Sequence, residues 1–410
     1  MTPNERSERL DGSGADPAGK RGAAPVDAIR VDESNPALVE AIRAEIEREG
    51  PIPFARFMSL ALYHPEHGYY LAPQERTGRT GDFLTAPEAT PLFGAAVARQ
   101  VEEFWQRLGE PRPFVLREYG AGSGSLGLAL LERLRADRSG LLDALRYAPI
   151  ELNAHRQREL RDRLRAAGLE CCLAEDAAQG LMTGCVLANE FVDALPVHRV
   201  RQLGGELAEL YVAWEGGRFR QVPGPPSTGE LAAYLDRVGA RLGEGQETEV
   251  NLEVRAWLGR VAGDLVRGAV LIVDYGYEAE ELHSVRRPEG TLKASHAQTL
   301  ERDPFRRIGR QDLTAHVDLT ELRLAAGDLG LDVLGLTTQG SFLAGAGLGE
   351  ILSGELERTT SVTAYLETRS AAMFLLDPRR TGGFRVLVLG RGLPAEPPLL
   401  GLSVRIERGR

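Results

Sequence analysis

The stretch REYGAGSGSLG, residues 117–127, decides the fold. A short apolar run, FVL, precedes it, and a helix-like segment, LGLALLERLRA, begins at Leu126. A glycine-rich turn between a strand and a helix lets the backbone approach a ligand closely, because glycine has no Cβ. The N-terminus of the following helix offers free N–H groups to an anionic part of that ligand. The stretch therefore predicts a ligand site at the carboxyl end of a strand.

Strand-like and helix-like segments alternate around this turn. The predicted strands are FVLREY (114–119), RYAPIELN (146–153), LECCLAED (169–176), GCVLANEF (184–191), GAVLIVDYGY (268–277), a run near 331–339 and FRVLVLG (384–390). Helical segments are predicted at 125–135, 154–167 and 318–329, with further helices near 347–376. This alternation is typical of βαβ units, so the predicted fold class is α/β with a doubly wound, mostly parallel sheet.

Two regions depart from this rhythm. After the first 34 residues, which have no periodicity, Asn35 is placed to cap a helix, and IPFARFMSLALYH predicts a second one. HRVRQLGGELAELYVAWEGGRFRQVP alternates in polarity, and its two Gly-Gly pairs predict an antiparallel meander. The expected organisation is a disordered leader (1–34), an N-terminal helical region or lid (35–112), the first half of the ligand-binding domain (113–198), an inserted subdomain (199–267), the second half (268–392) and a C-terminal tail (393–410).

The composition excludes several classes of protein. Charged residues make up 26% of the 410 and the net charge is -10, which argues against general binding to nucleic acid or to anionic membranes. No apolar run is long enough for membrane insertion. Three cysteines, of which Cys171 and Cys172 are adjacent, are typical of a reducing cytoplasm, and neither their spacing nor the scattered histidines predict a metal site.

The glycine turn admits three ligand classes. GxGxxG, the dinucleotide fingerprint, fits only in the register that begins at Gly122, two residues later than the strand end requires. G-x-S-x-G, the nucleophile elbow of hydrolases, fits neither Ser123 nor Ser125. The third class is a cationic ligand: Glu118 would repel a pyrophosphate but attract an ammonium or sulfonium group. S-adenosylmethionine (SAM) carries both cations and no phosphate.

Acids after the next two predicted strands extend this site. Glu151 is placed to bond the ribose hydroxyls of an adenosine, which suits NAD and SAM alike. Asp176 is expected near the adenine. An acid after a strand is also common as a solvated cap, so this alternative stays open at each position.

The chain resembles the MidA/NDUFAF7 family of SAM-dependent methyltransferases. The resemblance spans about residues 35–392 and rests on GPIPFARFM, HGYY, GDFLTAPE, EYGAGSGSL, NEFVDALPVH, EVNLE, DYGY and DLTAHVD. It implies a seven-strand methyltransferase sheet with an N-terminal helical region and an inserted subdomain. For the mitochondrial branch, it also implies methylation of an arginine on a subunit of respiratory complex I. The family's Gly-Pro-Gly is here Gly120-Ala121-Gly122, which keeps the turn small.

Two family motifs supply further candidates. In GDFLTAPE, Thr85 and Glu88 have the spacing of a helix capping box, which leaves Gly81 and Asp82 for a lid over the cofactor. NEFVDALPVH follows a strand, where doubly wound sheets bind their ligands, although its polar residues could instead cap a helix. The predicted cofactor-binding residues are Gly81, Asp82, Glu118, Gly120, Gly122, Gly124, Glu151 and Asp176. The predicted catalytic residues are Asn189, Glu190 and Asp193.

The sequence thus predicts a cytoplasmic SAM-dependent methyltransferase that acts on a protein side chain, with arginine as the candidate acceptor. The enzyme would need to align the nucleophile with the methyl group and exclude water. A guanidinium is delocalised and strongly basic, so carboxylates such as Glu190 and Asp193 would have to hold it. The alternatives are a non-catalytic SAM-binding assembly factor and an NAD-dependent oxidoreductase. The expected partners are a protein substrate and, as a further option, a second copy of the chain.

Overall fold

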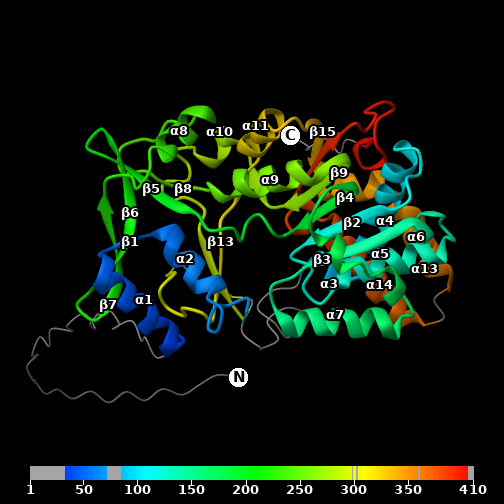
Figure 1. The fold of residues 1–410 in the computed structure, drawn as a ribbon, viewed down its shortest axis with the longest axis horizontal. Coiled ribbons are helices and arrows are strands. Elements are labelled where there is room, and N and C mark those ends of the chain that lie inside the picture. Colours follow the sequence, from blue (N-terminus) through cyan, green and yellow to red (C-terminus); the bar gives the residue numbers. More distant parts are fainter. Residues whose placement is uncertain (1–32, 72–84, 298, 302, 359–360, 405–410) are drawn as a thin grey trace, which may run out of the picture. The chain divides into compact units, whose positions relative to one another are not determined.

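The computed structural model describes residues 33–71, 85–297, 299–301, 303–358 and 361–404 (Figure 1). The predicted leader lies outside these residues apart from its last two. Of these, Ser34 is buried, and its hydroxyl donates a hydrogen bond to the carbonyl of Arg306. Among the described helices, none is long and apolar enough to cross a membrane.

The centre of the fold is a mixed sheet, which has six strands in the described residues. Its order is β15 (Asp332–Thr338), β16 (Arg385–Arg391), β9 (Leu265–Asp274), β4 (Met182–Asn189), β2 (Phe114–Tyr119) and β3 (Leu145–Ile150). The last four strands are mutually parallel, whereas β16 is antiparallel to both of its neighbours. The α/β class and the mostly parallel sheet are thus confirmed, but the seven-strand description holds only in part.

The missing strand is LECCLAED at the edge of the sheet. It forms the 3₁₀ turns η2 (Glu170–Cys172) and η3 (Glu175–Ala178), with a single parallel bridge from Leu173 to Tyr147 of β3. Arg117 of β2 provides the physical reason. Its buried guanidinium donates hydrogen bonds to the carbonyls of Ala177 and Gly180 and pairs with Asp264 at 2.7 Å. These bonds hold the chain against β2 after its single bridge, so no seventh strand develops.

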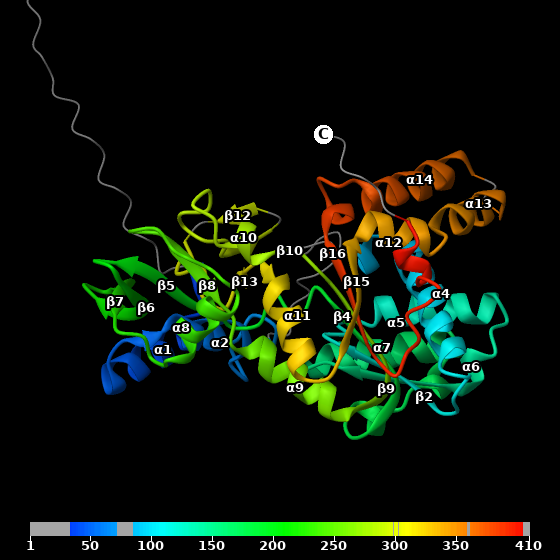
Figure 2. The same cartoon turned by 90° about the horizontal axis from the view of Figure 1, so that it is seen from above.

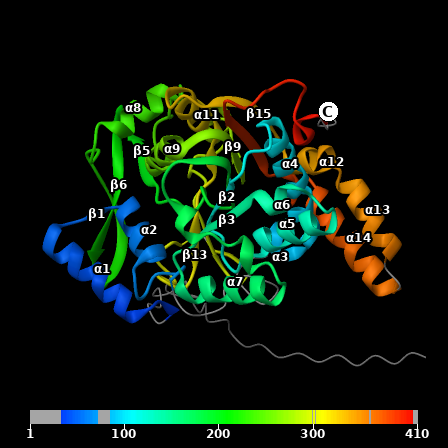
Figure 3. The same cartoon turned by 45° about the vertical axis from the view of Figure 1, so that its right-hand side comes forward.

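Helices cover both faces of the sheet (Figures 1 and 3). One face is covered by α4 (Pro91–Arg107), α5 (Ser125–Ala136), α6 (Leu141–Ala144), α7 (Ala154–Ala166), α12 (Gln339–Gly345), α13 (Leu348–Arg358) and α14 (Val362–Leu376). The opposite face is covered by α9 (Glu253–Asp264) and α11 (Leu319–Asp328). Successive residues of one strand, such as Val270 and Leu271, pack in the cores on opposite faces of the sheet. Because both faces are buried, the strands appear in the sequence as continuous apolar runs.

The predicted meander forms a second sheet. It contains β5 (His198–Leu203), β6 (Glu206–Glu215) and β7 (Arg218–Gly224), extended by β1 (Ile52–Pro53) and β8 (Glu247–Val250). All four glycines of its two Gly-Gly turns have positive φ, as type I′ hairpins require. The helices α1 (Pro36–Glu49) and α2 (Phe54–Tyr63) share a core with this sheet, and Asn35 caps α1 as expected. The helix α8 (Glu230–Arg237) packs in a smaller core beside it.

The remaining short elements connect the two sheets. They are α3 (Ala86–Ala89), β10 (Gly276–Tyr277), α10 (Ala279–Leu282), β11 (Lys293–His296), β12 (Thr299–Glu301), β13 (Asp312–Thr314) and β14 (Val317–Asp318). The structure also places α9, which falls in the expected insertion, against the six-stranded sheet. Likewise α1 and α2 pack with the meander, whereas α4 packs on the main sheet.

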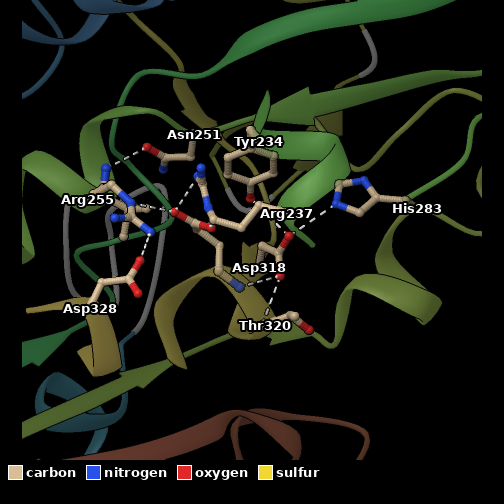
Figure 4. Close-up of polar contacts among 10 residues, drawn as sticks. Tyr234, Arg237, Asn251, Arg255, His283, Asp318, Thr320 and Asp328 are labelled. Atoms are coloured by element: carbon tan, nitrogen blue, oxygen red, sulfur yellow. Dashed lines mark hydrogen bonds and ion pairs between the residues drawn. The ribbon is translucent and has the colours of Figure 1, made fainter. Parts of the chain in front are cut away.

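Buried polar contacts join α8, α9 and α10 to α11 (Figure 4). The buried Glu321 accepts hydrogen bonds from Arg237, which reaches both carboxylate oxygens, and from Arg255. One turn earlier, Asp318 caps α11 and binds the hydroxyl of Tyr234 and the ring of His283. These contacts fix the inserted segment to the helix that covers the main sheet.

Candidate active site

A cavity of about 780 Å³ lies at the carboxyl ends of β2, β4 and β9. The end of α2, the strands β11 and β13, and the segment before β16 complete its walls. The cavity therefore occupies the position where doubly wound sheets bind ligands. Three sheets contribute to it: the main sheet, the pair β10 and β14, and the small sheet of β11, β12 and β13.

The glycine turn forms one wall. Gly120, Gly122 and Gly124 have φ values of 68°, 55° and 77°, which side chains with a Cβ rarely adopt. A Cβ on Gly124 would lie 2.7 Å from the Cγ of Leu160, so this glycine also allows close packing of α7. Sequence analysis therefore identified the turn, whereas the close approach of a ligand to its glycines stays a prediction and the packing of Leu160 was missed.

Glu118 lies buried beside the turn. The hydroxyl of Tyr147 donates a hydrogen bond to its Oε2 at 2.6 Å. Burial raises the pKa of this carboxyl to about 7, although the bond from Tyr147 acts in the opposite direction. Gly127 permits this pair, because a Cβ there would lie 2.3 Å from the Tyr147 hydroxyl. Glu118 is thus a buried acid whose pKa is set mainly by burial and that has no ion pair within the described residues.

Glu151 follows β3 and closes the other side of the turn. Its Oε2 accepts the backbone N–H of Gly122 at 2.8 Å, and its Oε1 accepts that of Asn153 at 2.7 Å. The carboxylate therefore fixes the shape of the glycine turn while it lines the cavity. Each carboxylate oxygen keeps a second lone pair for a ligand hydroxyl.

The three predicted catalytic residues lie together after β4. Glu190 has a φ of 48°, a strained value for a residue with a Cβ, and its Oε1 accepts the backbone N–H of Ala86 at 3.4 Å. Within the described residues, the Oδ1 atoms of Asn189 and Asp193 are buried and lack hydrogen-bond partners. The stretch between Asn189 and β5 is fully described and forms no helix, so none of these residues is a helix cap.

The two acids of this group carry perturbed pKa values. Burial raises the pKa of Glu190 to about 8, and the charge of Asp193 raises it further. Burial likewise raises the pKa of Asp193 to about 6, although a hydrogen bond from the Tyr275 hydroxyl to its Oδ2 opposes this shift. Asp274 is a buried acid behind them, and it accepts the backbone N–H groups of Val192 and Asp193.

Aromatic residues that the sequence analysis did not identify surround Asp193. The rings of Tyr63 and Tyr70 stack at 5.5 Å, and their hydroxyls donate to the Ala194 carbonyl and to Asp312, respectively. The ring of Tyr275 packs against His316 at 5.2 Å. Tyr63 and Tyr70 lie in FMSLALYH and HGYY, and Tyr275 in DYGY, so the motifs were visible, but nothing in the sequence indicated that they meet.

His316 is a second residue that was missed. Neither ring nitrogen has a hydrogen-bond partner among the described residues, and burial lowers the pKa of the imidazole to about 3. It is therefore neutral, stacked on the ring of Tyr277. Lys293, whose pKa burial also lowers, lines the same wall.

Three further predictions have other outcomes. Gly81 and Asp82 lie outside the described residues. Asp176 is exposed on η3 and lines a separate cavity with Arg112 and Arg146, near the amino ends of β2 and β3. Because its segment leaves the sheet edge after one bridge, it does not reach the carboxyl ends of the strands. The expected capping box at Thr85 is also wrong, since the structure gives this N-cap residue no side-chain capping bond.

The chemistry of the cavity fits SAM. Six acids line it, Glu88, Glu118, Glu151, Glu190, Asp193 and Asp312, together with six basic residues, Arg156, Arg260, Lys293, Arg379, Arg380 and Arg385. The left-handed glycine turn leaves its backbone accessible. Burial raises the pKa values of three of these acids, and a cation in the cavity would relieve this cost. The same carboxylates would repel a pyrophosphate. In the described residues, no cluster of acids, histidines or cysteines has the arrangement of a metal site.

Comparison with known proteins agrees with this chemistry. Residues 96–337 match the family model described as "Putative S-adenosyl-L-methionine-dependent methyltransferase". A crystal structure from Burkholderia thailandensis, bound to S-adenosyl-homocysteine, is 32% identical and has a TM-score of 0.80; the match covers 93% of this chain and 97% of that one.

Curated relatives are similar over most of the chain. The mitochondrial protein arginine methyltransferase NDUFAF7 homolog of Drosophila melanogaster is 29% identical, over 92% of this chain and 91% of its own. The human mitochondrial NDUFAF7 is 24% identical, over 84% and 81%. These mitochondrial names are at odds with the expected cytoplasmic location, and the scaffold alternative finds no support in them. The chain belongs to the SAM-dependent methyltransferase family that includes NDUFAF7, and it uses SAM as its methyl donor.

Proposed function

We propose that this methyltransferase modifies the guanidinium of an arginine in a protein. The observation that carries the proposal is the group formed by Asn189, Glu190 and Asp193. Two of its buried oxygens lack partners among the described residues, and both acids have raised pKa values. A guanidinium offers five N–H donors and a permanent positive charge, which are the features this group lacks. Relatives named protein arginine methyltransferases support the same acceptor.

SAM supplies an electrophilic methyl group on a positively charged sulfur. The glycine turn, Glu118 and Glu151 are the residues that would hold it. Glu151 keeps lone pairs for the ribose hydroxyls, and Glu118 supplies negative charge near the turn. Their assignment as cofactor-binding residues is part of this proposal.

The acceptor side has three tasks. It must orient the guanidinium, keep water out and accept a proton, because the acceptor nitrogen loses one when it is methylated. Tyr275 fixes Oδ2 of Asp193, which leaves Oδ1 to bind the acceptor. Glu190 is the better proton acceptor of the two acids, since its pKa is the higher. The stacked rings of Tyr63 and Tyr70 form a wall that limits access of water.

The test is transfer from methyl-labelled SAM into protein of a cell extract from the source organism. Acid hydrolysis of the labelled protein should release methylarginine. Asp193→Asn should lower the labelling rate by about 100-fold or more, because truncating one partner of a buried, hydrogen-bonded charge pair costs about 2–5 kcal/mol. Asp176→Asn, an exposed acid outside the cavity, should leave it unchanged. Label in lysine, label lost as methanol in mild base, or no labelled protein would each refute the proposed acceptor.

A further inference from the structure

The helix α14 has a composition that is unusual for an exposed helix. It reads VTAYLETRSAAMFLL, and only Glu367 and Arg369 among its 15 residues are charged. Such a helix is normally buried on all sides. Here only Ala372 and Leu375 are buried, and they pack in the core of the main sheet.

The outward side of α14 carries a row of large apolar side chains. Val362, Leu366 and Met373 are 77%, 54% and 62% exposed, and Tyr365 is 39% exposed. Over 11 residues at 1.5 Å each, the row from Val362 to Met373 extends about 17 Å along the helix. Figure 2 shows α13 and α14 as outer helices beyond α12 and α4. The exposed Arg369 lies between Leu366 and Met373 on this side, at i+3 and i−4, so one charge interrupts the row. Exposed apolar side chains gathered on one side of a helix mark an interaction surface.

The C-terminal end of α14 leads directly into the wall of the active site. Asp377 follows the helix, and the next residues, Pro378 to Thr381, line the cavity. Contacts fix this segment to the helix: the hydroxyl of Thr381 donates to the carbonyl of Phe374, and the guanidinium of Arg380 lies 5.5 Å from the Phe374 ring. The helix that carries the apolar row therefore leads, along the chain, directly into the cavity wall.

The junction carries two arginines and one acid, because Arg379 and Arg380 both pair with Asp377, so its net charge is positive. The side chains of Arg379 and Arg380 are 88% and 62% exposed, in a chain whose net charge is -10. They border the cavity on the side from which α14 approaches. A partner that follows the helix toward the cavity would meet an apolar surface first and two cations next.

We propose that the exposed row of α14, Val362, Tyr365, Leu366 and Met373, is the docking surface for the acceptor protein. The matching partner surface is an apolar patch with acidic residues beside the methylated side chain. This inference rests on the proposed protein acceptor. A second copy of the chain could also cover an apolar helix, but the direct path from this row into the cavity favours the molecule that must enter the cavity. A membrane is disfavoured, because interfacial helices carry a strongly basic polar face that α14 lacks.

The test compares two double variants that change exposed apolar residues to serine. Leu366→Ser with Met373→Ser alters the row, and Leu181→Ser with Val285→Ser alters side chains of similar exposure elsewhere. The rate of label transfer from methyl-labelled SAM is measured against increasing concentrations of extract protein. The α14 variant should label protein at least about tenfold more slowly at low extract concentration, the size expected for losing an interface anchor. Its dissociation constant for SAM and the labelling by the control variant should match those of the unmodified enzyme.

Other outcomes separate the alternatives. Unchanged labelling by the α14 variant would overturn the docking surface, even where the product is methylarginine. A dimer of the unmodified enzyme that the variant loses, seen by light scattering, would assign the row to a second copy. Flotation with phosphatidylglycerol–phosphatidylethanolamine vesicles that the variant loses would assign it to a membrane. Slower labelling of a residue other than arginine would uphold the docking surface and refute the arginine acceptor, whereas no labelled protein at all would refute both.

Discussion

Replacing Glu118 with glutamine should stabilise the protein at alkaline pH while it weakens SAM binding. Burial raises the pKa of Glu118 from an ordinary 4.5 to about 7 in the folded chain. For such a group, stability is fully present below the unfolded pKa and is lost as pH rises through the folded one. The pH window is therefore about 4.5 to 7. Glutamine keeps an oxygen that can accept the Tyr147 hydroxyl but has no charge to bury.

The magnitude follows from the shift of the pKa. A difference of about 2.5 units corresponds to roughly 3 kcal/mol once the carboxyl is ionised in both states, of which about 2.5 kcal/mol falls between pH 5 and 8.5. A chain of this size has an unfolding entropy of about 0.8 kcal/mol per kelvin, so the expected change in Tm is about 3 °C. Relative to Glu118→Gln, the unmodified protein should lose about 3 °C of Tm between pH 5 and pH 8.5.

Differential scanning fluorimetry of both proteins without SAM measures this difference, and calorimetry at pH 8.5 gives the SAM affinities. Comparing the two proteins at each pH cancels the titration of all other groups. A Tm difference that does not change with pH would show that Glu118 is not a desolvated acid. A glutamine variant with unchanged SAM affinity would remove Glu118 from the site.

Three further predictions concern the site and the fold. In the unmodified enzyme, kcat/KM measured with both substrates far below saturation should rise about tenfold between pH 7 and 9, because ionisation of Glu190, with a pKa of about 8, generates the acceptor-binding form. Glu190→Gln should abolish this rise, and a flat profile in the unmodified enzyme would contradict the reasoning. Gly127→Ala should lower stability by about 1–3 kcal/mol in thermal unfolding, because its Cβ must displace the hydroxyl of Tyr147, and an unchanged Tm would refute the close approach. Replacing both Arg237 and Arg255 with methionine should destabilise the protein by about 3–5 kcal/mol, because only the double variant leaves the buried Glu321 of α11 without a cation. This loss should exceed the sum of the two single variants, and additive effects would show that the two arginines do not share Glu321.

Local signals made the cofactor side of the site predictable. The strand, the glycine turn, the following helix and Glu118 all lie within about 25 residues, and their order along the chain fixes their geometry. Asn189, Glu190 and Asp193 could be placed for a similar reason, since they follow a central parallel strand. The acceptor side could not be predicted in this way. Tyr63 lies beside Asp193 only because the end of α2, which packs with the meander, reaches Ala194 after β4. Tyr275 reaches Asp193 because β9 is the neighbour of β4 in the main sheet, and no local pattern reveals either contact.

The errors have local causes. LECCLAED reads as a buried strand by its apolar content, but the buried guanidinium of Arg117 competes for its backbone carbonyls, and this sets the position of Asp176. The spacing of Thr85 and Glu88 satisfies a capping box, yet the long helix begins later, where Thr90 caps it by accepting the N–H of Leu92. In both cases the local pattern is present in the sequence, but a contact with residues outside the pattern determines the structure.

The raised pKa values of the site acids and the aromatic wall of the cavity have one physical link, which is the exclusion of water. Desolvation is the largest cause of the shift at Glu118, Glu190 and Asp193 alike. The stacked rings of Tyr63 and Tyr70 are part of the wall that keeps water from Asp193, so the helical region that carries them takes part in setting the charge of the site. Where these desolvated acids are ionised, their burial lowers the stability of the folded protein, and a bound cation would reduce this cost. A sulfonium donor and a guanidinium acceptor both carry that positive charge, so binding of either should stabilise the folded enzyme. The same acids that lower the stability of the free protein thereby select a cationic donor and a cationic acceptor.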